Sequence, residues 1–237
     1  MIKIILFMLL VICIIIFIKK YNTEIILDKN EYKLVEYSFK FSRKKQFNDS
    51  RLTYGFDSNK NMDDIFKKFK IDYKMIEFYN KINKMDNVKE KFLGIDKNEN
   101  SIKVYLTVDD YMYSLEKKDN KYKHRNYKAT LITKKDLDKF IGQNNSTYFC
   151  DVFGGYKDKI AVYAKYDESE NYNLYSFYIK IINMKLKDYS NKILNMLKKM
   201  NINIEGIDKM FKQYNNYYIA WISIKYDLDV CFYFREK

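Results

Sequence analysis

Proline is absent from the 237-residue chain, glycine occurs six times, cysteine three times and histidine once. The scarcity of proline and glycine excludes a collagen-like chain, and three cysteines are too few for a disulfide scaffold. The single histidine and the unpaired cysteines argue against a zinc site, and there is no glycine-rich phosphate loop. A serine or cysteine nucleophile normally relies on a histidine base. We therefore predict no cofactor, no metal and no catalytic residue, and the question of an enzyme stays open with a lean toward a non-enzyme.

Charge of one sign is in excess, with 44 basic against 31 acidic residues and a formal net charge of +13. Only four of the basic residues are arginine. Arginine is the preferred bidentate contact to phosphate, so its scarcity makes nucleic acid an unfavoured partner. Lysine, asparagine, isoleucine, tyrosine and phenylalanine are plentiful, and all have A/T-rich codons. An A+T-rich genome therefore explains the basic composition without an acidic partner.

The longest hydrophobic run covers residues 4–18, with the sequence IILFMLLVICIIIFI, and lysines flank it on both sides. As a helix it spans about 22 Å, which is shorter than the ~30 Å core of a bilayer. Flanking lysines that snorkel reduce this mismatch. No small residues follow as a cleavage site, so we predict an uncleaved signal-anchor with membrane lipid as the partner of residues 4–18. The predicted organisation is a transmembrane anchor over 1–20, a linker over 21–30 and one domain over 31–237.

The side of the membrane stays open in this interpretation. Arg43, Lys44 and Lys45 follow the anchor and slightly favour a cytosolic domain. Sequons such as Asn144-Asn145-Ser146 point weakly the other way, and a bond between Cys150 and Cys231 would need an oxidising compartment. The predicted localisation is a single-pass membrane protein.

Beyond the linker, apolar residues recur with both strand and helix periods. Period-2 patterns and apolar runs predict strands over 35–41, 88–95, 102–108, 121–128, 146–153, 160–166, 174–182, 217–226 and 230–234. Helical periods predict about four helices within 62–85, 133–141 and 186–200, with N-caps at Asp72 and Thr133 and a C-terminal glycine at Gly142. The predicted fold class is an α+β domain with an antiparallel sheet.

Two segments of the chain share a similar pattern, which suggests a duplicated helix–hairpin unit. A helix that begins at Asp72 is followed by Gly94-Ile95-Asp96, and a helix that includes Asp188 is followed by Gly206-Ile207-Asp208. In this hypothesis each Gly-Ile-Asp precedes an apolar strand of an equivalent unit.

The best candidate for a binding surface is the basic-aromatic strand 121–128. Its cations alternate with rings that could stack on bases or meet anionic headgroups. The candidate binding residues are Lys121, Tyr122, Lys123, His124, Arg125 and Tyr127. The alternative is an exposed edge strand whose lysines block unwanted pairing.

Three functions remain as hypotheses. The first is a membrane-anchored, non-enzymatic binding or structural protein of a cell envelope or virion, with an unidentified protein partner. The second is a membrane-tethered transferase or phosphate-handling enzyme with a sheet cavity lined by lysine and tyrosine, towards which Asp96 or Asp208 would converge. The third is binding of lipid headgroups or nucleic acid by strand 121–128.

Overall fold

A computed structural model describes residues 27–43, 48–96, 100–153, 159–167, 173–225 and 228–236. Within these ranges there are ten strands: β1 (Leu34–Phe41), β2 (Asn48–Asp57), β3 (Val88–Asp96), β4 (Ser101–Val108), β5 (Tyr111–Lys118), β6 (Lys121–Thr133), β7 (Lys159–Asp167), β8 (Asn173–Lys185), β9 (Tyr218–Lys225) and β10 (Val230–Arg235). The helices are α2 (Asp63–Lys68), α3 (Tyr73–Asn83), α4 (Lys134–Ile141), α5 (Gln143–Phe153), α6 (Leu186–Lys199) and α7 (Ile207–Gln213).

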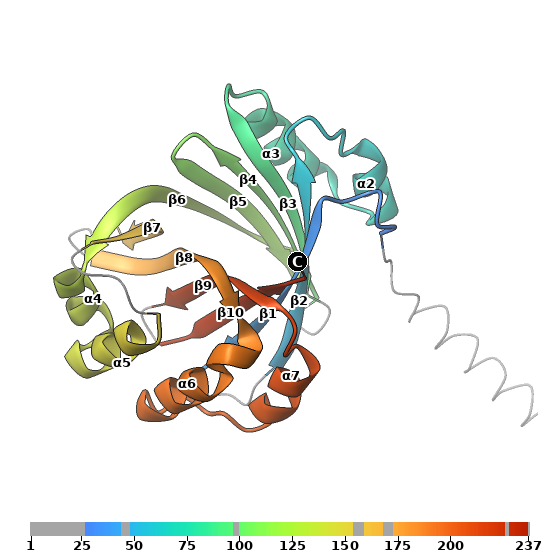
Figure 1. Cartoon of the computed structure of the whole chain (residues 1–237). Coiled ribbons are helices and arrows are strands. Elements are labelled where there is room, and N and C mark those ends of the chain that lie inside the picture. Colours follow the sequence, from blue (N-terminus) through green and yellow to red (C-terminus); the bar gives the residue numbers. More distant parts are fainter. Residues whose placement is uncertain are drawn as a thin grey trace, which may run out of the picture.

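The strands form one closed barrel in which each strand pairs with its neighbours in the sequence and β10 pairs with β1. Every pairing is antiparallel, and the closing pair aligns Glu36 with Arg235 and Phe39 with Phe232. Strands therefore run alternately up and down around the barrel. Figure 1 shows the helices outside it, with α2 and α3 beside β3 and β4 and the other four helices beside the later strands.

The alternation gives the barrel two different ends. The connections β1–β2, β3–β4, β5–β6, β7–β8 and β9–β10 lie at one end, which we call the hairpin end. The connections that contain helices lie at the opposite end, which we call the helix end. A residue near the start of an even-numbered strand is therefore close to the hairpin end.

The hydrophobic core lies between the outer face of the barrel and the helices. One cluster packs α2 and α3 against β2–β5, with Phe66, Met75 and Leu106 at its centre. The second packs α4–α7 against β6–β10 and β1, and it includes Phe177 and Phe232. Because successive side chains of a strand point to opposite faces, the residues between these apolar positions face the inside of the barrel.

The predicted fold class is wrong, because the described chain is mostly sheet and closes into a barrel instead of forming a layered α+β domain. The strands β2 and β5 were not predicted. The segment 146–153, predicted as a strand, belongs to α5, where Phe149, Val152 and Phe153 share the buried face at helical spacing. Its β-branched and aromatic residues indicate burial, which a helix face satisfies equally well.

The predicted single-pass membrane topology is also not supported. No helix among the residues that the structure describes is long and apolar enough to cross a membrane. The hydrophobic run 4–18 and residues 21–26 of the predicted linker 21–30 lie outside the described residues. The predicted single-pass localisation therefore has no support from the described residues.

The proposed duplication aligns elements that differ. Gly94 lies within β3, where it pairs with Thr53 and Lys103. Gly206 instead precedes α7 as its N-cap, with a φ of 80°. One Gly-Ile-Asp is therefore part of a strand and the other begins a helix, so the match comes from a recurring composition.

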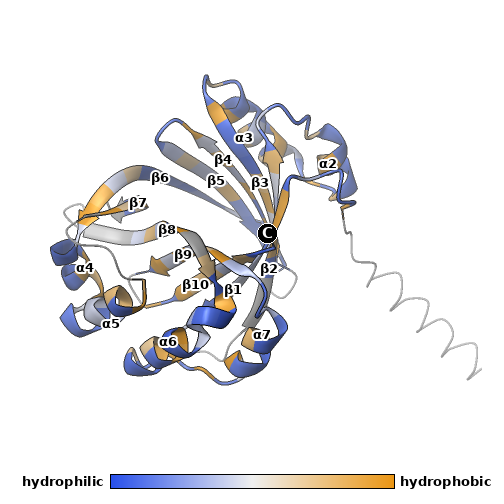
Figure 2. Cartoon of the chain, viewed as in Figure 1, coloured by the Kyte–Doolittle hydropathy of each residue, from blue (hydrophilic) through white to orange (hydrophobic). Residues whose placement is uncertain are grey.

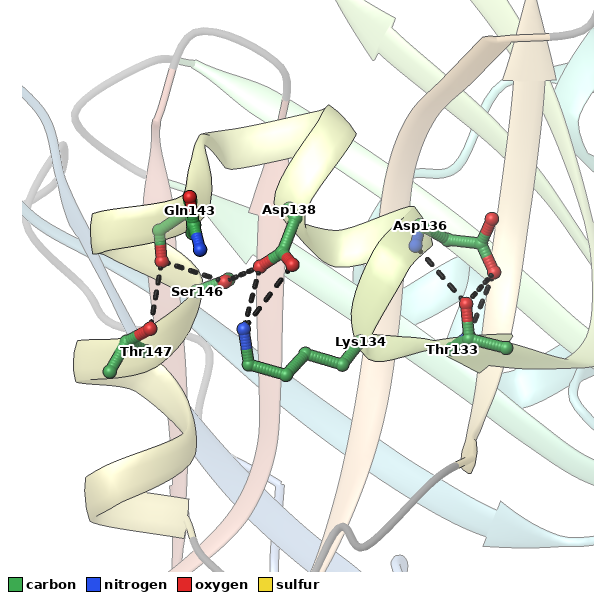
Figure 3. Close-up of polar contacts among 7 residues, drawn as sticks. All are labelled: Thr133, Lys134, Asp136, Asp138, Gln143, Ser146 and Thr147. Carbon is green, nitrogen blue, oxygen red and sulfur yellow. Dashed lines mark hydrogen bonds and ion pairs between the residues drawn. The ribbon is translucent and has the colours of Figure 1, made fainter.

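The predicted local signals at helix ends are confirmed. The Asp72 side chain accepts a hydrogen bond from the Met75 amide at the start of α3. Thr133 and Asp136 form a complete capping box at the start of α4, and Gly142 follows that helix with a φ of 85°. Figure 3 shows the box and the turn into α5, where Lys134 and Ser146 both contact Asp138. Short-range capping patterns thus survive in a fold of a different class.

Thr133→Ala is expected to lower the free energy of unfolding by about 1 kcal/mol, because it removes the acceptor of the Asp136 amide. Urea unfolding followed by circular dichroism measures the change. Thr147→Ala is the matched control, since its hydroxyl only donates to the Gln143 carbonyl at an exposed position of α5. Equal losses in both variants would contradict the capping role.

Candidate functional site: the barrel lumen

The inner face of the barrel is polar along most strands. In β2, Leu52, Tyr54 and Phe56 pack outward, and the alternate residues Arg51 and Thr53 face inward. Apart from arginine and lysine, small hydroxyl residues are frequent on this face. The inward residues nearer the hairpin end include Ser38, Arg51, Asp96, Ser101, Lys103, Glu116, Arg125, Ser176, Ser223, Lys225 and Cys231. We call this set the polar half of the lumen.

Three cations surround one carboxylate in the polar half. Arg51 Nη2 lies 2.8 Å from Glu116 Oε1, and Arg125 Nη2 lies 2.7 Å from Glu116 Oε2. Arg51 also donates to the Tyr105 hydroxyl at 2.9 Å. Lys103 stands directly opposite Glu116 in the pairing of β4 with β5. These residues form the cation cluster, defined here as Arg51, Lys103 and Arg125 with Glu116.

Gly94 makes the cluster possible. Arg51 starts on β2 and reaches partners on β4 and β5, so its side chain must cross β3. A Cβ atom on Gly94 would lie 2.9 Å from Arg51 Cδ and 3.2 Å from Cε2 of the Tyr105 ring. The missing side chain therefore leaves the space through which Arg51 crosses the strand.

Lys103 is the unusual member of the cluster. Its side chain is fully buried, with an exposed fraction of 0%. Its Nζ finds no hydrogen-bond partner within the described part of the chain. Its Nζ instead lies over the Tyr105 ring, 4.2 Å from the ring centroid. A buried amine without a partner costs free energy, so this position is not explained by stability.

The charges of the cluster lower the pKa of both Lys103 and Glu116, which favours the neutral amine and the ionised carboxylate. Burial and the positive charges of Arg125 and Arg51 lower the pKa of Lys103 well below its ordinary range, against the attraction of Glu116. Burial by itself would raise the pKa of Glu116, but the two guanidinium groups lower it to about 2. Glu116 is therefore ionised at neutral pH, whereas the Lys103 amine is biased toward its neutral form.

Toward the helix end the lumen becomes aromatic. It contains a chamber with about 50 Å³ of free volume, lined by Glu36, Thr53, Phe92, Tyr105, Thr107, Met112, Tyr178, Trp221 and Tyr233. Tyr178 contacts Tyr127 in a T-shaped arrangement with ring centroids 5.0 Å apart. The hydroxyls of Thr53 and Thr107 have no hydrogen-bond partner in the described residues. Tyr105 belongs to both regions, since it lines the chamber and contacts Arg51 and Lys103.

The six predicted binding residues do not form one surface. Arg125 and Tyr127 face the lumen, whereas His124 packs against Phe78 of α3 with ring centroids 5.4 Å apart. The Tyr122 hydroxyl donates to Asp72 at the start of α3. Lys121 and Lys123 are exposed. Nothing here tests binding of nucleic acid or lipid headgroups by this strand, and both stay predictions.

The first part of β6 is paired on one side only. Residues 121–128 pair with β5, but the described pairing with β7 covers only Lys128–Thr133. Figure 2 shows the corresponding change along β6, which is hydrophilic over its first part and hydrophobic toward α4. This hydrophilic segment is an edge beside the polar half of the lumen, which agrees with the sequence alternative of an edge strand protected by lysines.

Other predicted residues lie apart from one another. Asp96 is buried near Arg51 in the lumen, whereas Asp208 is exposed on α7, so the two carboxylates do not converge. Cys231 is on the inner face of β10, and Cys150 packs on the outside with α5; both thiols are free. The described residues contain no group of three histidine, cysteine or acidic side chains that could hold a metal ion.

Sequence reasoning missed Arg51, Lys103 and Glu116. The signal for Lys103 was present, because Lys103, Tyr105 and Thr107 form the polar side of a clean alternation. A polar side is normally exposed, and the pattern alone does not distinguish solvent from a polar lumen.

Fold and site together define a ten-stranded antiparallel barrel with a charged lumen. Comparisons with protein-family models, with curated proteins and with solved structures gave no match to this chain. The function is therefore argued from the lumen itself.

Proposed function

We propose that the protein is a binding protein that takes a small anionic ligand, a carboxylate or a phosphate group, at the cation cluster. The observation that carries this proposal is the fully buried Lys103 amine, which has no hydrogen-bond partner among the residues that the structure describes. An anion placed against it would supply the missing acceptor. The nearby guanidinium groups of Arg51 and Arg125 add positive charge, and they are opposed by Glu116 and by Asp96, which is paired with Arg51 across β2 and β3.

The size of the chamber limits the ligand. A free volume of about 50 Å³ admits a group of only a few heavy atoms beside the aromatic side chains. Tyr105 connects this chamber to the cation cluster. A short carboxylate such as propionate fits this arrangement, with its charge toward Lys103 and its methyl group toward the rings. Inorganic phosphate would occupy the charged part alone.

Binding is expected to couple to a proton. Burial and neighbouring cations hold the pKa of Lys103 low without a ligand, and a bound anion raises it again. The ligand complex therefore takes up a proton, and affinity falls as the pH rises through the range in which the bound form loses that proton.

Propionate or phosphate at about ten times its Kd is expected to stabilise the protein by about 1.4 kcal/mol. For a domain of this size that corresponds to a rise in Tm of about 3–6 °C. Differential scanning calorimetry in sodium chloride of equal ionic strength measures the specific effect. Benzoate, which carries the same carboxylate on a larger apolar group, serves as the size comparison.

Two lysine variants make this measurement specific. Lys103→Met is expected to abolish the ligand-induced rise, whereas Lys187→Met removes the same charge from an exposed position of α6 and keeps it. A rise of equal size in both variants would place the anion elsewhere and refute the proposal.

A further inference from the structure

The Lys103 amine has the surroundings of a nucleophile. It is fully buried, it donates no hydrogen bond to the described residues, and Arg51 and Arg125 lie in the same cluster. A lysine that is desolvated beside other cations is the arrangement that keeps an amine neutral and reactive toward carbonyl groups. A lysine with only a binding role would be expected to pair with a carboxylate, and here Glu116 is held by both arginines.

Resting on the proposed function, we propose that the ligand is an oxo acid, with an aldehyde or ketone beside its carboxylate, and that Lys103 forms an imine with it. The guanidinium groups of Arg51 and Arg125 orient the carboxylate, and this places the carbonyl carbon at the Lys103 Nζ. The aromatic residues of the chamber then cover the remainder of the ligand and exclude water.

The step balances without any oxidant or reductant. In complexes whose Lys103 amine is neutral, its lone pair attacks the carbonyl carbon, and the π electrons of the carbonyl move to its oxygen. Both amine protons are transferred to that oxygen, which leaves as water when the C=N bond forms. Hydrolysis reverses the reaction and releases the ligand.

Tyr105 is the positioned proton donor for this transfer. Its hydroxyl accepts a hydrogen bond from Arg51 Nη1 at 2.9 Å, which leaves its own proton to donate. Its ring lies against the Lys103 Nζ and also lines the chamber. Tyr105 therefore belongs to the same part of the lumen as the Lys103 amine and the chamber that would hold the ligand.

Reductive trapping with pyruvate as the probe tests the inference. The full chain is incubated at neutral pH with pyruvate and sodium cyanoborohydride, and the adducts are located by peptide mass spectrometry. Only about one ordinary lysine amine in a thousand is unprotonated near pH 7.4. Lys103 is therefore expected to carry adduct on the order of tenfold or more above any exposed lysine.

The variants separate a reactive amine from a general labelling reaction. Lys103→Met fills a similar volume and lacks the nucleophile, so it is expected to lose the preferential adduct while exposed lysines react as before. Tyr105→Phe is expected to retain the labelled site and slow its formation. Calorimetry and circular dichroism confirm that each variant is folded. Adduct spread evenly over the lysines of the folded wild-type protein would overturn the inference.

Propionate distinguishes this inference from the proposed function, because it has a carboxylate but no carbonyl group. A rise in Tm with propionate that depends on Lys103, without preferential trapping of pyruvate, leaves anion binding intact and refutes the imine. Absence of both effects refutes both proposals. Preferential trapping that propionate inhibits in competition supports both.

Discussion

Glu116→Gln is expected to lower the free energy of unfolding by about 3–5 kcal/mol, the largest effect of a conservative change in this barrel. The substitution keeps the shape of the side chain and removes its charge. Arg51 and Arg125 then remain buried without their shared carboxylate. Lys103 also loses the one negative charge that opposes the depression of its pKa. Chemical unfolding of the wild type and the variant at neutral pH measures the difference.

The matched control is Glu77→Gln, which removes the same charge from an exposed position of α3. Its expected change is within about 0.5 kcal/mol. If the two variants lost the same stability, the Arg51–Glu116–Arg125 contacts would have no net role in the fold.

The lowered pKa of Glu116 also predicts how the stability of the protein changes in acid. The pKa of Glu116 is about 2 in the folded protein and 4.5 in its ordinary state. A carboxyl group with a lowered pKa stabilises the folded state above the higher value, and this contribution disappears as the pH falls through the lower one. The wild type therefore loses stability between pH 4.5 and 2 more steeply than Glu116→Gln does.

Lys103→Met is expected to act in the opposite direction and raise the free energy of unfolding by about 1–3 kcal/mol. Methionine fills a similar volume and needs no hydrogen-bond partner, whereas the buried amine has none among the described residues. The variant loses the contact of Nζ with the Tyr105 ring, which offsets part of the gain. Urea unfolding at pH 7 measures the change.

The pH dependence identifies the cause of this gain. Because the folded pKa of Lys103 is lowered, the unfolded chain binds more protons up to its ordinary pKa of 10.5. Wild-type stability therefore rises with pH above the lowered pKa of the folded state and up to the ordinary value of 10.5, and Lys103→Met lacks this contribution. If Lys103→Met is more stable than the wild type but no longer stabilised by propionate, the wild-type lysine lowers stability in order to bind the ligand. A loss of stability would instead mean that the amine supports the fold.

The sequence predicts those parts of this molecule that depend on neighbours along the chain. Asp72 and Thr133 begin helices as predicted, because a capping side chain bonds an amide three residues away. Strands such as 35–41 and 102–108 follow from period-2 alternation. Closure of the barrel depends on the pairing of β1 with β10, and no local pattern carries information about it.

The candidate site was out of reach for the same reason. Arg51 belongs to the candidate site only because its side chain passes over β3 at Gly94 and bonds Glu116. These residues are distant in the sequence. Strand 121–128 was predicted as a binding surface because its cations and rings lie close together in the sequence. Alternation then divides it, so that Arg125 belongs to the lumen and His124 to the packing of α3. Residues that are neighbours in the sequence of a strand are therefore divided between the two faces of the barrel wall.

The pairing of β1 with β10 joins the two ends of the described chain. Arg235 bonds Glu36 across the seam of the barrel, although 199 positions separate them in the chain. Segments that emerge early from a ribosome can already pair with one another, because each strand pairs with the next. The inner face nevertheless stays in contact with water until the final strand has emerged. Full desolvation of Arg51 and Lys103 in the lumen therefore requires the complete ring of strands, with β10 paired to β1.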